Sequence, residues 1–251
     1  MAEPLLQVDN LSRRFGGLLA VDKASFSAQA GRITAVIGPN GAGKTTLFSI
    51  ITGFQRPTSG HVRYGGADIT GEPPHRLARR GIARTFQIVQ PFAALSVREN
   101  IAVGSHLRHA GRADALDAAS AVGESVGLGG QLDKSASVLT VAGRKRLELA
   151  RALAIEPRLL LLDEVLAGLN PSEVRDMVPV VRAIGARGVT ILMIEHVMQA
   201  VMSLAEHVYV LSEGRIIAEG SPRVVAGDRR VVEAYLGRGA AARMTGEMAH
   251  A

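Results

Sequence analysis

The 251-residue sequence contains no cysteine and no tryptophan, and only 4% of its residues are aromatic. Without cysteine the chain has no disulfide framework, no thiol nucleophile and no thiolate-bound metal, which suits a reducing cytosol. No apolar run approaches the roughly 18 residues of a membrane-spanning helix, and no N-terminal stretch has a signal-peptide layout. We therefore expect neither a membrane span nor a secreted, disulfide-stabilised domain.

The chain also lacks long blocks of like charge, although its net charge is +6. Its arginines occur singly or in pairs, such as Arg13 and Arg14 or Arg79 and Arg80. A nucleic-acid-binding arm is not indicated, and the excess charge fits a solvated surface or a surface near anionic lipid. The 47% of hydrophobic residues are enough for one large domain, or for one domain with a subdomain.

One glycine-rich stretch organises the rest of the chain. Residues 38–45 fit the pattern G-x-x-x-x-G-K-[ST]; an apolar β-branched run, 33–37, precedes them, and a helical run, 47–52, follows and ends before Gly53. Strand, glycine loop and helix together predict a site where backbone N–H groups and the helix N-terminus bind phosphate. Its residues are Gly38, Pro39, Asn40, Gly41, Ala42, Gly43, Lys44, Thr45 and the following Thr46.

Side chains in and beyond this loop supply the chemistry of a nucleotide site. Lys44 can bridge the outer phosphates, and the Thr45 hydroxyl can ligate Mg²⁺. A buried strand, 158–164, ends in Asp163 and Glu164. We expect Asp163 to hold Mg²⁺ through water, and Glu164 to activate the attacking water as a general base.

Two polar residues at other strand ends are further candidates. The strand 189–194 leads into His196, for which a contact to the γ-phosphate is favoured over a purely structural role. The strand 82–86 leads into Gln87, whose amide can reach Mg²⁺ or the attacking water, although a glutamine there is usually a surface residue.

The remaining segments are predicted from periodicity and turn residues. Phe15, beside the turn Gly16-Gly17, can stack on a purine, although packing in the core is the more common role for such a residue. Strands are expected at 5–10, 20–27 and 61–64, and in a hairpin of 208–212 with 215–219. Helices are expected at 74–80, 97–109, 113–126, 145–155, 172–187 and 231–236, with Val141 to Gly143 as a joint between two of them.

In this order the motifs resemble the nucleotide-binding subunit of ABC transporters, over roughly residues 5–236. Phe15 stands where that family stacks adenine, residues 38–45 at Walker A and Gln87 at the Q-loop. Residues 139–146 stand at the signature motif, 159–164 at Walker B, 167–170 at the D-loop and His196 at the switch histidine.

The resemblance implies an α/β fold, with a P-loop NTPase (RecA-like) core, an antiparallel β subdomain and an inserted α-helical subdomain. Residues 1–236 would form the ATPase domain, in which 1–90 and 157–236 make the core with the β subdomain and 91–156 the helical signature subdomain. Residues 237–251 would form a flexible C-terminal tail.

A narrower resemblance is to LivG-type ATPases. It rests on the segments 84–87, 95–101, 167–171 and 233–237. Those subunits drive uptake of branched-chain and other hydrophobic amino acids, and relatives import urea or short amides. The resemblance implies ATP and Mg²⁺ as ligands, permease subunits as partners at the cytoplasmic face of the membrane, and indirect contact with a solute-binding protein. Residues 91–92 would begin the surface that receives a short helix of the permease.

The signature departs from the family's usual Leu-Ser-Gly-Gly-Gln and reads Leu-Thr-Val-Ala-Gly from residue 139. Thr140 keeps a hydroxyl for the γ-phosphate. Val141 and Ala142 still offer backbone N–H groups but restrict the loop to negative φ more than glycine would, and Gly143 lacks the glutamine side chain. Thr140, Ala142 and Gly143 are the signature residues expected to bind nucleotide. In the family two subunits close head to tail, so this segment would complete the site of a second copy or of a related ATPase. Two alternatives therefore stay open for this protein: it hydrolyses ATP efficiently, or it is a switch that binds ATP and hydrolyses little of it.

Two other classes are less compatible with the sequence. A soluble P-loop kinase would need an acceptor-substrate site and a lid. It would have no role for a histidine that follows a strand, such as His196, or for the signature-like segment upstream at 139–146. An ABC protein acting on DNA or ribosomes usually carries two ATPase units or long insertions, for which 251 residues leave no room.

Overall fold

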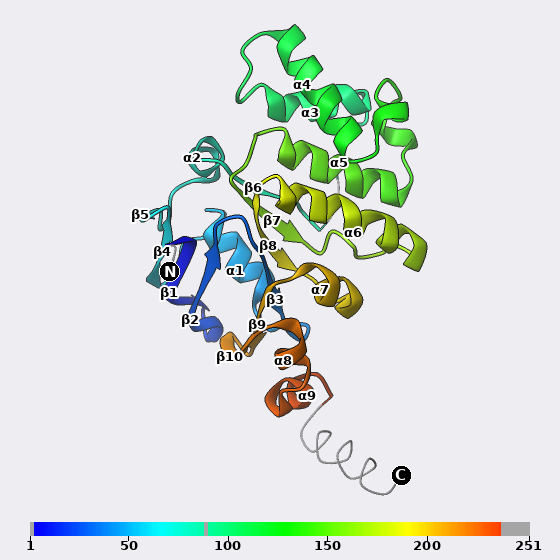
Figure 1. Cartoon of the computed structure of the whole chain (residues 1–251). Coiled ribbons are helices and arrows are strands. Elements are labelled where there is room, and N and C mark those ends of the chain that lie inside the picture. The colour runs from blue at the N-terminus through cyan, green and yellow to red at the C-terminus, as the bar shows by residue number, and fades with distance from the viewer. Residues whose placement is uncertain (1–2, 88–89, 237–251) are drawn as a thin grey trace, which may run out of the picture.

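The computed structural model describes residues 3–87 and 90–236, and folds them into two sheets with helices around them (Figure 1). In the larger sheet, β3 is central, β6 to β9 are parallel, and β10 pairs antiparallel with β9. Its strands, in spatial order, are β10 (Arg215–Gly220), β9 (His207–Ser212), β3 (Ile33–Ile37), β8 (Thr190–Ile194), β7 (Leu159–Asp163) and β6 (Ile82–Arg84).

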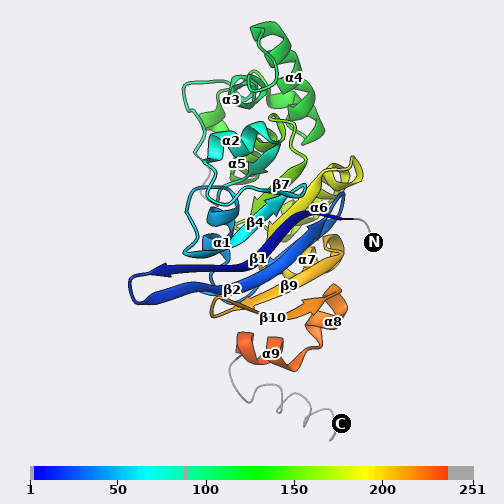
Figure 2. The same ribbon diagram turned by 90° about the vertical axis from the view of Figure 1, so that its left-hand side faces the viewer.

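The smaller sheet is antiparallel and lies against the core through helix α1. Its order is β2 (Leu18–Gln29), β1 (Pro4–Phe15), β4 (Ser59–Tyr64) and β5 (Ala67–Asp68). The β1–β2 hairpin extends well beyond the rest of the molecule in Figure 2. Helix α1 (Lys44–Ile51) buries Leu47, Phe48 and Ile51 in a hydrophobic cluster shared by both sheets.

A group of helices lies at one end of the larger sheet, beside β6 (Figure 1). It contains α3 (Val97–Ser105), α4 (Arg112–Ser125) and α5 (Val141–Leu153), and α2 (Pro74–Arg79) leads toward it. Ser96 begins α3 with a capping box, in which its hydroxyl accepts from Glu99 N and the Glu99 carboxylate accepts from Ser96 N.

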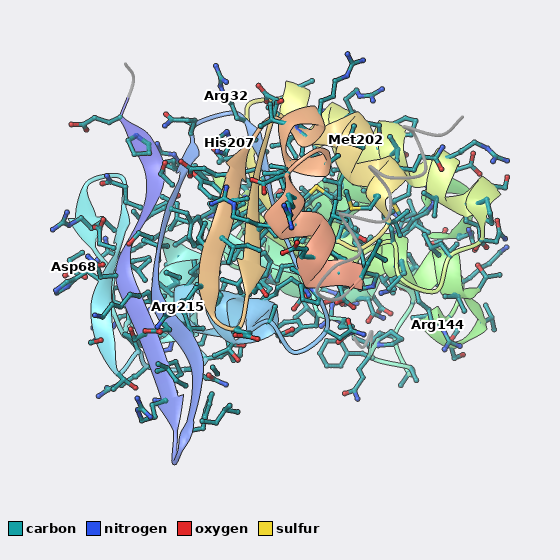
Figure 3. The ribbon with its side chains drawn as sticks, turned by 90° about the horizontal axis from the view of Figure 1, so that it is seen from below. Arg32, Asp68, Arg144, Met202, His207 and Arg215 are labelled. Carbon is teal, nitrogen blue, oxygen red and sulfur yellow. The ribbon has the colours of Figure 1, made fainter. Side chains whose placement is uncertain are left out.

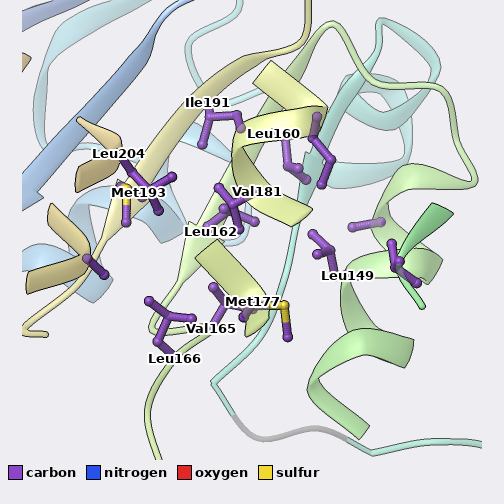
Figure 4. Packing of buried hydrophobic residues seen from close by; sticks show 14 of the residues in the cluster. Leu149, Leu160, Leu162, Val165, Leu166, Met177, Val181, Ile191, Met193 and Leu204 are labelled. Carbon is purple, nitrogen blue, oxygen red and sulfur yellow. The ribbon is translucent and has the colours of Figure 1, made fainter. Parts of the chain in front are cut away.

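The face of the larger sheet opposite α1 carries four helices. They are α6 (Pro171–Ala186), α7 (Met198–Leu204), α8 (Pro222–Ala226) and α9 (Arg229–Leu236). Figure 4 shows Val181 of α6 next to Leu162 of β7 and Met177 of α6 near Val165, and all four residues belong to one hydrophobic cluster. Strands β3, β7 and β8 are buried along their whole length because both faces are covered, which explains their unbroken apolar sequences.

Most of the predicted elements are confirmed, with ends shifted by a few residues. The joint expected at Val141 to Gly143 is wrong: these residues form the first turn of α5, because the Thr140 hydroxyl accepts from Gly143 N and caps the helix. Two helices, α7 and α8, were not predicted, since each is too short for a periodic pattern.

The division into core and helical subdomains stays a prediction, and the predicted C-terminal tail lies outside the described residues. Within residues 3–87 and 90–236, no helix is both long and apolar enough to cross a membrane.

Candidate nucleotide site

Four neighbouring parallel strands bring the candidate residues to one edge of the larger sheet. The glycine loop follows β3, Asp163 ends β7 and Glu164 follows it, His196 follows β8, and Gln87 lies just beyond β6. Because parallel strands all end at the same edge, residues up to 158 positions apart in the chain become neighbours: 196 − 38 = 158.

A cavity of about 830 Å³ opens at this edge. This volume falls in the range of small-ligand sites. The β1–β2 hairpin, the glycine loop and the polar residues at the strand ends all contribute to its lining. The lining residues are Phe15, Leu18, Leu19, Ala20, Asn40, Gly41, Ala42, Gly43, Lys44, Thr45, Thr46, Gln87, Glu164, His196, Glu213 and Gly214.

The glycine loop needs glycine at two positions for steric reasons. Gly38 has φ 155°, and a Cβ there would lie 1.9 Å from the carbonyl oxygen of Leu211. Gly43 has φ 102°, and a Cβ there would lie 2.2 Å from the carbonyl oxygen of Ala20. The loop can therefore pack tightly onto both sheets, and residues 40–46 at the N-terminus of α1 line the cavity.

Lys44 is buried at the base of the cavity and bonded to the loop itself. Its Nζ donates to the carbonyl oxygens of Gly38 at 2.7 Å and Pro39 at 2.9 Å. Gly38 and Pro39 thus hold the lysine rather than line the cavity. Burial lowers the pKa of Lys44, and the nearby carboxylates of Glu164 and Asp163 oppose that shift.

Glu164 lies between two of the predicted site residues. Gln87 Nε2 donates to Glu164 Oε2 at 2.5 Å, and His196 Nδ1 lies 3.4 Å from Glu164 Oε1. Glu164 has φ 50°, a left-handed conformation that costs a residue other than glycine on the order of 1 kcal/mol. The fold maintains this strain at the carboxylate that contacts both Gln87 and His196.

Asp163 lies deeper and is paired with an arginine that we did not single out from the sequence. Arg84 donates to Asp163 Oδ2 at 2.6 Å and to Ser49 Oγ at 3.1 Å, and both side chains of the ion pair are almost fully buried. Asp163 Oδ1 is buried with no hydrogen-bond partner among the described residues. A buried acceptor of this kind fits a bound cation or an ordered water.

Thr45 and Asp163 line a second hollow, of about 470 Å³, which Gln87 also borders. No cluster of three or more His, Asp or Glu side chains suited to a metal occurs in the described part of the chain. Mg²⁺ is commonly bound by one or two protein oxygens together with substrate phosphates, so this donor set fits a magnesium ion that is held jointly with a nucleotide.

Phe15 lies at the tip of the β1–β2 hairpin, 40% exposed, with Arg13 stacked on its ring at 4.5 Å. The alternative that Phe15 packs in the core is therefore wrong. An exposed ring beside the cavity suits stacking on a planar base, which remains a prediction.

The signature residues lie apart from the cavity. Thr140, Ala142 and Gly143 begin α5, and Figure 3 shows their neighbour Arg144 on the opposite side of the molecule from the β1–β2 hairpin. Val and Ala at positions 141 and 142 adopt helical backbone angles, which glycine is not needed for, so these departures from the usual signature cause no local strain.

Several residues that contact the site were missed at the level of sequence. They are Arg84, Lys145, Glu148, Glu195 and Tyr235. Only Glu148 and Tyr235 carried a signal in the sequence, a polar residue between two apolar neighbours, whereas Lys145 stands between two arginines and Arg84 and Glu195 each have a polar neighbour.

Glu195 is fully buried behind the site. Its Oε1 accepts from Leu166 N at 2.9 Å, and its Oε2 has no hydrogen-bond partner among the described residues. Burial raises the pKa of Glu195 from 4.5 to about 7, against the smaller opposing effect of the Leu166 N–H. The folded protein therefore binds a proton here more tightly than the unfolded chain does.

Glu195→Gln is expected to stabilise the protein at pH 8 and to have little effect near pH 5. Because the folded pKa is raised, stability falls as pH rises from about 4.5 to about 7, by roughly 3 kcal/mol. Glutamine keeps an acceptor for Leu166 N and has no charge to desolvate. Thermal unfolding at both pH values measures the effect, with the exposed Glu219→Gln as control, and equal shifts at both pH values would contradict it.

Comparison with known families gives two matches. Residues 21–167 match the ABC transporter family, and residues 215–241 match the family described as branched-chain amino acid ATP-binding cassette transporter. These matches cover the glycine loop, the signature and the acidic strand, and separately the C-terminal hairpin and helices.

Individual relatives match over nearly the whole chain. The branched-chain amino acid transport ATP-binding protein BraF of Pseudomonas aeruginosa is 39% identical, covering 94% of this chain and 99% of the relative. LivG of Escherichia coli is 37% identical with the same coverage. Two solved ATP-binding cassettes of ABC transporters, one nucleotide-free and one in an ADP conformation, superimpose with a TM-score of 0.86 at 33% identity, over 94% of this chain and 100% of each cassette.

Proposed function

The chain belongs to the ABC transporter family, and from this we propose that it is the ATP-binding and ATP-hydrolysing subunit of an importer for branched-chain amino acids. The names of the relatives BraF and LivG support this solute class, as does the family match at the C-terminus. The observation that carries the catalytic part is Glu164 held between Gln87 and His196 beside the buried Lys44.

Each side chain then has a specific role in hydrolysis. Lys44 exchanges its bonds to Gly38 and Pro39 for bonds to the nucleotide phosphates. Glu164 accepts a proton from the attacking water, and His196 contacts the γ-phosphate. Thr45, Gln87 and Asp163 would hold Mg²⁺, which when bound supplies positive charge against the phosphate oxygens.

We further propose that two ATPase subunits pair head to tail, because Thr140, Ala142 and Gly143 lie away from the chain's own cavity. The Thr140 hydroxyl and the first N–H groups of α5 suit a phosphate presented by a partner. The partner is a second copy of this chain or a related ATPase.

Hydrolysis rates across a series of protein concentrations test this pairing. A rate per subunit that rises steeply with concentration means that copies of this chain complete each other's sites. ATP binding without turnover at any concentration means that another ATPase supplies the second half or that the chain is a switch. Adding the assembled transporter separates these two outcomes, since only the first regains turnover.

The contact with the permease is proposed at a groove of about 240 Å³ between α2, α3 and α5. Phe54 and Phe86 border it as an edge-to-face pair with ring centroids 5.5 Å apart, and both rings are exposed. Apolar side chains that remain exposed beside a concave surface suit the docking of a short helix. The subunit would then be held at the cytoplasmic face of the membrane by its permease.

Phe54→Asp is expected to weaken binding to the permease at least tenfold without changing ATP affinity, because it places a charge in a groove whose lining includes no residue of the glycine loop. Co-purification and binding of the detergent-solubilised permease measure the effect. Val224→Asp, at an equally exposed apolar position on α8, is the matched control. Equal losses from both variants would place the permease elsewhere.

A further inference from the structure

Helix α5 contains a buried lysine that the roles above do not use. Lys145 is 7% exposed, although lysine is rarely buried without an acidic partner. No carboxylate among the described residues lies within ion-pair distance of its ammonium group. Its Nζ instead donates to the main-chain oxygen of Glu164 at 3.1 Å and to that of Gln87 at 3.3 Å.

These two carbonyl groups belong to the residues whose side chains meet in the cavity. Gln87 follows β6 and Glu164 follows β7, and their amide and carboxylate are joined by a hydrogen bond of 2.5 Å. Lys145 bonds the same two residues through their backbones. A single ammonium therefore fixes the spacing on which the contact between Gln87 and Glu164 depends.

The bond to Glu164 also acts where the backbone is strained. Glu164 has φ 50°, and its carbonyl oxygen accepts from Ala167 N at 3.1 Å as well as from Lys145. A charged donor at that carbonyl favours the left-handed conformation that directs the Glu164 side chain toward His196.

The next turn of α5 contacts the same segment. Glu148, three residues after Lys145, accepts from the backbone N–H of Phe86 at 3.3 Å and is paired with Arg151 at 3.2 Å. Residues at this spacing share one face of a helix, so α5 bonds the backbone of both Phe86 and Gln87.

The same helix begins at the signature. Thr140 caps α5, and Lys145 lies five residues later, about 7.5 Å along the helix axis. In a head-to-tail pair, the first turn of α5 faces the nucleotide of the partner while Lys145 bonds the catalytic segment of its own chain. If the partner's nucleotide shifts α5 when it binds or is hydrolysed, Lys145 would therefore also move Glu164 and Gln87 in the site of its own chain.

We propose that Lys145 is a positioning residue that holds the main chain of Glu164 and Gln87, and that it links the signature end of α5 to the catalytic carboxylate of the same chain. The inference rests on the proposed ATPase function. It predicts that Lys145 acts on turnover rather than on the capture of ATP, because its contacts do not reach the glycine loop.

The test compares Lys145→Met, which removes the donor, with Lys145→Arg, which keeps a charged donor, and with Lys134→Met, an exposed lysine in the same helical region. We expect the Met variant to lower kcat 10- to 100-fold with KM and ATP affinity within twofold of wild type. The Arg variant should keep kcat within threefold, and Lys134→Met should match wild type. An unchanged kcat in Lys145→Met would overturn the proposal.

Hydrogen exchange gives a readout that does not depend on turnover. Lys145→Met should speed exchange of the amides at 164–169 at least tenfold while the amides of α5 stay protected. If α5 loses protection in Lys145→Met, the result for Lys145→Arg tests the proposal instead. Slow exchange at 164–169 together with normal kcat in Lys145→Arg supports it, and fast exchange together with a lowered kcat overturns it. If wild type binds ATP but never hydrolyses it, the proposed ATPase function fails, and the exchange at 164–169 still decides the role of Lys145.

Discussion

Glu164→Gln is expected to reduce ATP hydrolysis by about 10²- to 10⁴-fold, the contribution of a positioned general base, while ATP affinity stays within about twofold of wild type. Glutamine retains the shape of the side chain and an oxygen that can accept the hydrogen bond from Gln87 Nε2. It cannot accept a proton from water at neutral pH. The variant should therefore bind ATP and stop before the chemical step.

Phosphate release under saturating ATP measures the hydrolysis rate, and equilibrium titration with a fluorescent ATP analogue measures affinity. Glu219→Gln, on the exposed side of β10, is the control for loss of a carboxylate. Retention of more than a tenth of the wild-type rate in Glu164→Gln would show that another group acts as the base. Asp163 would be the next candidate, although Arg84 already occupies one of its two carboxylate oxygens.

Lys44→Met is expected to weaken ATP binding at least 100-fold and to abolish measurable hydrolysis. The ammonium already lies at the base of the cavity, bonded to the carbonyl groups of Gly38 and Pro39. Charge-assisted hydrogen bonds contribute roughly 1.5–3 kcal/mol each, so loss of two to the phosphates corresponds to about 3–6 kcal/mol of binding free energy. Methionine has a similar length and an apolar side chain, so the fold should be retained.

Isothermal titration with ATP, run beside thermal unfolding, separates lost binding from lost structure. Lys23→Met, on the exposed side of β2, removes a positive charge away from the glycine loop and should leave affinity unchanged. ATP affinity within tenfold of wild type in Lys44→Met would mean that the backbone N–H groups and the N-terminus of α1 hold the phosphates without the lysine.

The two variants also distinguish binding from chemistry. Lys44→Met is expected to lose ATP binding and therefore hydrolysis, whereas Glu164→Gln is expected to lose hydrolysis and still bind ATP. This pair of results would show that the protein behaves as an ATPase. A chain that binds ATP and shows no turnover even before mutation behaves as a switch, the alternative that the altered signature leaves open.

The structure changes how the altered signature is understood. From the sequence, Val141 and Ala142 would stiffen a loop in which relatives have glycine. In the structure they begin a helix that Thr140 caps, and helical backbone angles suit both residues. The loss that remains is the glutamine side chain at position 143, which affects only the site that the partner would bring.

The sequence by itself determined the parts that depend on local geometry. The glycine loop, the strand before it and the helix after it are contiguous, so spacing and β-branched runs were sufficient to predict them. The acidic end of β7 and the polar ends of β6 and β8 were predictable for the same reason, as each follows an apolar run. The alternation of strands and helices then placed these ends at one sheet edge.

Only the tertiary structure decided the contacts that join distant segments. The bond from Arg84 to Asp163 spans 79 positions and that from Lys145 to Glu164 spans 19, and no local pattern encodes either pairing. The raised pKa of Glu195 likewise depends on how completely the surrounding elements exclude water from it. Burial and hydrogen-bond partners are properties of the packed chain, because they arise only when elements far apart in sequence are brought together.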